Sequence, residues 1–183
     1  MSELSERTGG RAARWLRSLL HRTPLPDGFD GDLDGDERVL AGAPVAGGGH
    51  LVITTLGLWV PDGDAHRRIG WHLVSKATWD GRALTVVEAD EVGTVSRREP
   101  ASGSSESMLE PASGSSDGTA VLIADRAPRR FALPEPGRVP EVVHARVTRS
   151  VLHSGRDAEG NLVVRRRVPG RDGVRLQIRR STA

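Results

Sequence analysis

Three aspartates alternate with other residues in a short acidic stretch near the start of the chain. Asp30, Asp32 and Asp34, followed by Gly35, match the opening of a calcium loop, in which alternate carboxylates surround one ion. Such a loop closes with a bidentate glutamate at its twelfth position, which is Ala41 here. The three aspartates are therefore an incomplete metal candidate. We favour a solvated acidic turn, or an intramolecular partner for the basic C-terminal tail, over a calcium site.

A second group of residues, between positions 11 and 22, combines positive charge with an apolar stripe. Apolar side chains recur there at helical spacing, and arginines occupy the other side. Such a helix can lie on an anionic membrane surface with its apolar side chains inserted. The alternative is that the stripe packs on the body of the domain. The membrane-surface candidates are Arg11, Arg14, Trp15, Leu16, Arg17 and Leu19.

A third group lies in the arginine-rich C-terminal region, which we predict to be a β-hairpin. If its strands pair as the turn suggests, Arg165, Arg167, Arg175 and Arg179 share one face and form a phosphate-binding candidate. No aromatic residue is interleaved with them to stack on bases. The alternatives are a solvated edge, or a face neutralised by the acidic residues 30–37.

Motifs of common catalytic centres are missing from the sequence. It has no cysteine and no G-x-S-x-G, H-E-x-x-H, phosphate-loop or dinucleotide-binding pattern, and its histidines lack metal-ligand spacing. Because catalysis needs titratable groups that converge, we predict a protein that is not an enzyme and has no cofactor. An enzyme of unrecognised type is the last alternative.

Charge is distributed very unevenly along the 183 residues, although the net charge is only +2. Residues 1–22 carry five Arg and two Glu, and residues 138–183 carry eleven Arg and four acidic residues. Residues 23–37, in contrast, carry six acidic residues and no basic one. Basic ends therefore flank an acidic loop and a nearly neutral middle.

The elements that must position these groups are mostly short strands. Turn signals and β-branched runs predict seven strands, followed by a helix over 139–152 and a hairpin of 162–168 and 174–178. In the fourth strand, which we expect to be bent, Trp71 and Trp79 share one parity, and we expect both to be buried. The seven predicted strands are 37–45, 50–55, 58–61, 67–79, 82–89, 119–124 and 129–133.

Residues 94–118 interrupt the strands with a sequence rich in Ser, Gly and Pro. The heptapeptide EPASGSS occurs there twice, at 99–105 and 110–116. A segment of this composition buries too little apolar surface to offset its ordering entropy. We therefore predict a disordered insertion between two strands.

Several segments resemble the small bacterial pleckstrin-homology-like (PH-like) and GRAM-like domains. They are ERVL at 37–40, LVIT at 51–54 with LW at 58–59, RIGWHLV at 68–74 and WDGRALTV at 79–86. The whole chain is also similar to an uncharacterised family of actinobacterial proteins. The resemblance covers residues 36–153 and implies a seven-stranded antiparallel barrel or sandwich capped by a C-terminal helix. The loop at 44–49 lacks the basic cluster of lipid-binding members, which argues against phosphoinositide binding at the usual site.

Together these observations predict a mainly β (α+β) protein with three parts: residues 1–35, a PH-like domain at 36–153, and the hairpin at 154–183. We expect a non-catalytic binding or scaffold module, peripheral to a membrane or to a protein partner. A nucleic-acid-binding protein that uses the C-terminal arginines is the alternative. Because the chain has no apolar run long enough to span a bilayer, we expect it in the cytoplasm or at the inner face of the membrane.

Overall fold

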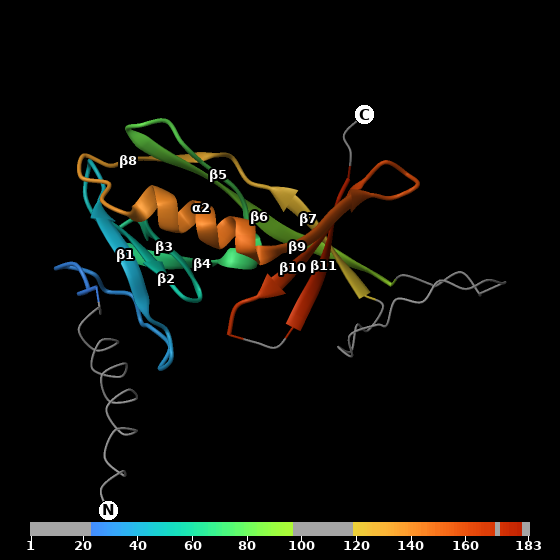
Figure 1. The fold of residues 1–183 in the computed structure, drawn as a ribbon, viewed down its shortest axis with the longest axis horizontal. Helices are drawn as coiled ribbons and strands as arrows, with labels where there is room; N and C mark the ends of the chain where they lie inside the picture. Colours follow the sequence, from blue (N-terminus) through green and yellow to red (C-terminus); the bar gives the residue numbers. More distant parts are fainter. Residues whose placement is uncertain (1–22, 97–118, 171–172, 181–183) are drawn as a thin grey trace, which may run out of the picture.

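Two β-sheets and one α-helix make up the described part of the protein, residues 23–96, 119–170 and 173–180 of a computed structural model (Figure 1). The first sheet is a four-stranded antiparallel meander, because each strand is joined to the next by a tight turn. In the first of these turns Gly47, Gly48 and Gly49 all have positive φ angles, which favour glycine. Its strands are β1 (Val39–Pro44), β2 (His50–Thr54), β3 (Gly57–Asp62) and β4 (Ala65–Gly70).

The second sheet is larger and mixed, with the order β5-β6-β7-β11-β10-β9 and β8 paired to β6. The long strand β6 pairs with β5 and β8 through its first half and with β7 through its second half. The β7–β11 pair is parallel. The result is a mainly β fold with a curled, half-barrel sheet. The strands are β5 (Val74–Trp79), β6 (Ala83–Ser96), β7 (Thr119–Asp125), β8 (Arg129–Ala132), β9 (Val151–Arg156), β10 (Leu162–Val168) and β11 (Gly173–Arg179).

Helix α2 (Val139–Ser150) lies along the open side of the curled strands and continues directly into β9 (Figure 1). Pro140 occupies its first turn, where a missing backbone N–H breaks no helical hydrogen bond. Val139 and Val143 are fully buried and attach this side of the helix to the core. None of the described helices is long and apolar enough to cross a bilayer.

The main core fills the space between the two sheets and α2. Trp71, in the 3-10 turn η1 (Trp71–Leu73), is only 2% exposed, and its indole N–H donates to the Thr54 carbonyl at 3.1 Å. The expectation of burial is confirmed for Trp71. Trp79, at the end of β5, is only partly buried, because η1 divides the predicted fourth strand and removes the shared parity.

The topology corrects several expectations. The described residues contain eleven strands and one parallel pair, so the seven-stranded antiparallel arrangement is wrong in detail. The helix ends at Ser150, and the boundary expected between 153 and 154 falls inside β9, so the hairpin is part of the larger sheet. Residues 94–96 belong to β6. The rest of the predicted insertion, and the predicted helix at 11–22 with all six membrane-surface candidates, lie outside the described residues.

Candidate functional site

The acidic stretch near the start of the chain contacts strand β4. Asp30 accepts a hydrogen bond from the His66 backbone at 3.0 Å and lies 2.5 Å from Nδ1 of its ring, and this bonding lowers the pKa of Asp30. Asp34 forms an ion pair with Arg68 at 2.8 Å. In the described residues no group of acidic, His or Cys side chains is arranged to hold a metal ion. The structure does not gather the three aspartates around one point, and Asp30 and Asp34 contact His66 and Arg68 of β4 rather than the basic tail.

Next to this stretch, Glu37 is a fully buried carboxylate with a complete set of partners. Its oxygens accept hydrogen bonds from the Thr54 hydroxyl and from the Trp59 indole at 3.0 Å, and Arg68 contacts it at 2.5 Å. Arg68 also lies over the Trp59 ring, 5.5 Å from its centroid. Its side-chain partners come from β2, β3 and β4, and the Asp34 backbone N–H also donates to it at 3.2 Å, so this network fastens the start of the chain to the first sheet.

The four hairpin arginines do not share a face. Arg165 pairs with Leu176 and Arg167 with Val174 across the hairpin, so these two point to the opposite side from Arg175 and Arg179. Arg165 and Arg167 are exposed. Arg175 pairs with Glu91, and Arg179 pairs with Asp125 at 2.8 Å. The predicted phosphate-binding face is therefore wrong as a single surface, because the register of β10 against β11 splits it.

Arg166, which is not among the phosphate-binding candidates, lies between Arg165 and Arg167 in the sequence. Unlike them it is buried, with only 6% of its surface exposed. Its guanidinium donates to the Val74 carbonyl and the Ser150 hydroxyl, each at 2.9 Å. Burial, and then the nearby Arg179, lower its pKa. Since its described hydrogen-bond partners are neutral groups around η1 and α2, Arg166 fastens the hairpin to the core.

A groove of about 680 Å³ runs between β1 and α2. Arg138, at the N-terminal end of α2, and positions 142, 145, 146 and 149 follow one another at helical spacing, next to the stripe of the buried valines. The opposite wall consists of β1 and Thr23, whose hydroxyl donates to the Leu40 carbonyl at 3.3 Å. The floor is apolar and half-buried. Its apolar residues are Val39, Leu40, Val142 and Ala145.

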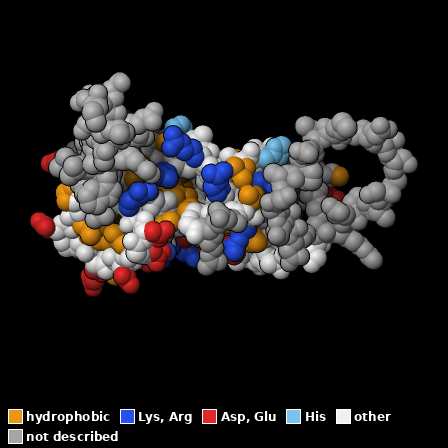
Figure 2. Space-filling view, turned by 60° about the horizontal axis from the view of Figure 1, so that its bottom comes forward, with side chains coloured by type: hydrophobic (Ala, Val, Ile, Leu, Met, Phe, Trp, Pro, Cys, Tyr) orange, Lys and Arg blue, Asp and Glu red, His pale blue; other side chains and the backbone are white. Residues whose placement is uncertain are grey.

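Positive charge dominates this α2–β1 groove. It is lined by Arg138, Arg146 and Arg149 and by a single acidic residue, Glu141. Burial, together with the nearby charges of Arg149 and Arg38, lowers the pKa of Arg146. Within the described part of the chain none of these four arginines forms an ion pair with a carboxylate. Figure 2 shows Lys and Arg side chains across the middle of one face of the molecule, with carboxylates gathered mainly toward one end.

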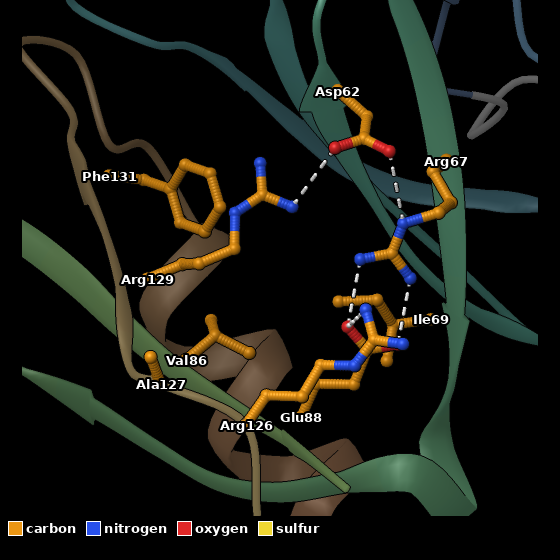
Figure 3. Close-up of a pocket in the computed structure, with 9 residues that line it drawn as sticks. All are labelled: Asp62, Arg67, Ile69, Val86, Glu88, Arg126, Ala127, Arg129 and Phe131. Carbon is orange, nitrogen blue, oxygen red and sulfur yellow. Dashed lines mark hydrogen bonds and ion pairs between the residues drawn. The ribbon is translucent and has the colours of Figure 1, made fainter. Parts of the chain in front are cut away.

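A second, smaller cavity of about 410 Å³ lies between β4 on one side and β6 and β8 on the other (Figure 3). Arg67 binds the buried Glu88 with two parallel hydrogen bonds of 2.7 and 2.8 Å, and this bonding raises the pKa of Arg67. Asp62 lies between Arg67 and Arg129, at 3.3 and 3.6 Å. Arg126 reaches Glu88 only at 3.8 Å. The floor is apolar and consists of Ile69, Val86 and Phe131.

Neither cavity was anticipated from the sequence. Arg138, Arg146 and Arg149 were visible only as part of a basic C-terminal third, and their helical spacing was the one available signal. The arginines of the smaller cavity come from segments about 60 residues apart, at 67 and at 126–129, which sequence spacing cannot connect.

The chain matches no protein-family model, and no curated protein or solved structure matches it either. Its function is therefore inferred from the chemistry of its own surfaces.

Proposed function

We propose that the protein is a non-catalytic binding module, and that its α2–β1 groove binds an acidic segment of a protein partner that carries some apolar side chains. The observation that carries this proposal is a set of arginines around an apolar floor, none of which forms an ion pair with a carboxylate of the described residues. Arginine pairs well with carboxylates because its planar guanidinium donates two parallel hydrogen bonds. The spacing from Arg138 to Arg149 corresponds to about 16 Å of helix, enough for several residues of a peptide.

The shape of the groove favours a peptide over a membrane surface. Insertion into a bilayer needs apolar side chains that protrude, whereas Val39, Leu40 and Val142 lie half-buried between the two walls. Residues 1–22 leave the described structure beside this groove at Thr23, but they carry a net charge of +3. Like charge disfavours them as the occupant and favours an acidic partner.

A relationship to PH-like domains is part of this proposal. It is supported by the order of elements, an antiparallel meander followed by further strands and then by a helix packed on the core. Domains of that type include peptide binders, which agrees with a groove beside the helix.

The test is binding of the full-length protein to a fluorescein-labelled, Glu-rich peptide with a few Leu residues, measured by fluorescence anisotropy. Replacing Arg146 and Arg149 with Gln should weaken binding at least about tenfold, a loss of about 1.4 kcal/mol. The matched control replaces Arg165 and Arg167 with Gln, which removes the same charge from an exposed surface and should leave affinity nearly unchanged. Copies of the peptide with Gln for Glu, or Ser for Leu, should bind more weakly.

Two parallel measurements decide between this proposal and its alternatives. Flotation with phosphatidylglycerol vesicles tests membrane binding, and a DNA mobility shift tests nucleic-acid binding. Equal loss of peptide affinity in both double variants would show that only net charge matters and would overturn the groove assignment. Binding to DNA that only the Arg165 and Arg167 variant loses, without peptide binding, would establish the nucleic-acid alternative. Binding to none of the probes would also overturn the proposal.

A further inference from the structure

The cavity between β4, β6 and β8 is separate from the α2–β1 groove and shares no lining residue with it. We propose that this cavity binds a small organic carboxylate that carries an apolar group. At about 410 Å³ it falls within the range of small-molecule sites.

The cavity occupies the place where the two sheets separate. In the described residues β4 pairs only with β3, and β8 pairs only with β6, so each strand has an edge without a strand partner. Figure 3 shows Arg67 and Ile69 of β4 on one side and Arg129 and Phe131 of β8 on the other, with Val86 and Glu88 of β6 between them. A ligand in this position would contact both sheets.

Not all of the guanidinium donors around the cavity are used. Arg67 is fully engaged by Glu88 and Asp62. Arg126 holds Asp90 through Nε and one terminal nitrogen at 2.7 Å, but its other terminal nitrogen reaches Glu88 only at 3.8 Å, which is longer than a hydrogen bond.

Arg129 is similar, because it donates to the Pro61 carbonyl at 2.5 Å but lies 3.6 Å from Asp62. Arg126 and Arg129 therefore each offer donors to an incoming anion, and Asp62, which is half-exposed, can turn toward solvent. A carboxylate placed between them would gain charge-assisted hydrogen bonds.

The apolar floor of the cavity favours a ligand with an apolar group attached to its carboxylate. Ile69, Val86 and Phe131 offer only apolar surface, and the Arg129 guanidinium already lies over the Phe131 ring, 5.2 Å from its centroid. An apolar group next to the carboxylate would displace water from this floor. An ion without such a group, such as acetate, would gain only the guanidinium contacts.

The probe for this site is sodium benzoate, titrated into protein labelled at its Ile and Val methyl groups and followed by NMR. We expect saturable shifts of the Ile69 and Val86 methyl signals with a Kd of about 1 mM, as suits a ligand of this size. Arg129→Gln should raise that Kd about tenfold. The matched control is Arg130→Gln on the neighbouring residue of β8, which pairs with Asp80 outside the cavity and should leave the Kd unchanged.

Further probes give the outcomes that would overturn the proposal. Benzyl alcohol, which has no charge, and acetate should both bind more weakly than benzoate. Equal binding of benzyl alcohol, no shift at Ile69 and Val86, or an unaltered Kd in Arg129→Gln would each reject the carboxylate site. Phenyl phosphate binding more than about tenfold tighter than benzoate would assign the cavity to phosphates instead. The methyl spectrum also reports whether each variant is folded, and Arg146→Gln protein should bind benzoate normally because the groove is a separate site.

Discussion

The two arginine clusters of this protein differ in how their charge is matched. Around the smaller cavity, Arg67, Arg126 and Arg129 face the carboxylates of Asp62 and Glu88, and Asp90 holds Arg126 from outside. Along the α2–β1 groove, three arginines face the single carboxylate of Glu141, with which none of them forms an ion pair. The first cluster therefore joins two sheets, whereas the second leaves positive charge that a partner can neutralise.

This difference matters because like charges held close together without counter-charges reduce stability, and a binding partner relieves that cost. The lowered pKa of Arg146, caused by burial and then by Arg149 and Arg38, is the sign of such an arrangement. In contrast, the pKa of Arg67 is raised by its hydrogen bonds to Glu88, which is the sign of a stabilising pair. Arg67 therefore serves the structure, whereas Arg146, in our proposal, serves recognition.

The largest effect should come from removing the buried carboxylate of the paired cluster. Glu88→Ala leaves Arg67 without its bidentate partner, and we expect a loss of about 3 kcal/mol in the free energy of unfolding. This value is at the low end for breaking a buried ion pair, because Arg67 is one-third exposed. Denaturant unfolding measures the loss. Asp62→Ala, at a half-exposed residue, should cost less than about 1 kcal/mol and is the control. Equal costs for the two variants would contradict a structural role centred on Glu88.

Replacing an arginine of the groove should weaken binding without reducing stability. Arg146→Met keeps most of the apolar stem but removes a half-buried charge, so stability should stay the same or rise by up to about 1 kcal/mol. Affinity for the Glu-rich peptide should nevertheless fall about tenfold. Unfolding and anisotropy measured on the same preparation check both values. A clear loss of stability would place Arg146 among the structural arginines.

High salt should affect the two arginine clusters differently. Raising ionic strength from about 0.1 to about 1 M shortens the Debye length from about 10 to about 3 Å, which screens exposed charges strongly and buried pairs much less. Peptide binding at the groove should therefore weaken several-fold over this range, measured by anisotropy. The stability difference between wild type and Glu88→Ala should change little. Peptide affinity that is independent of salt would show that the apolar floor, rather than the arginines, provides the binding.

The smallest effect concerns an exposed pair next to the paired cluster, Asp80 and Arg130. Backbone N–H groups of Ala83 and Arg82, and then Arg130, lower the pKa of Asp80 to about 2. A carboxyl whose pKa is lower in the folded state stabilises the fold above its unfolded pKa of 3.8 and loses this contribution as pH falls toward 2. Wild type should therefore melt slightly above Asp80→Ala at neutral pH, with the difference fading between about pH 4 and pH 2. Thermal melts across that range test it, and a difference that grows in acid would contradict it.

Elements encoded by patterns of a few neighbouring residues could be predicted from the sequence, whereas features that depend on strand pairing could not. Most of the strands were found because β-branched runs and turns such as Asp80-Gly81 act over a few residues. Strand β9 was missed because Val151 and Leu152 also fit the apolar spacing of the preceding helix. The hairpin arginines were assigned to one face because the pairing register was not known, and a shift of one residue moves a side chain to the other face.

The sequence by itself determined the mainly β character, the helix after the strands and the strongly basic C-terminal part, since these follow from local periodicity and composition. Only the tertiary structure decided which arginines are neutralised. Glu88 binds Arg67 across two sheets, Asp34 and Glu37 bind Arg68, and Arg166 is enclosed by η1 and α2. The physical reason is that an ion pair needs two atoms within a few ångströms, and the distance between residues along the chain does not set the distance between them in the fold.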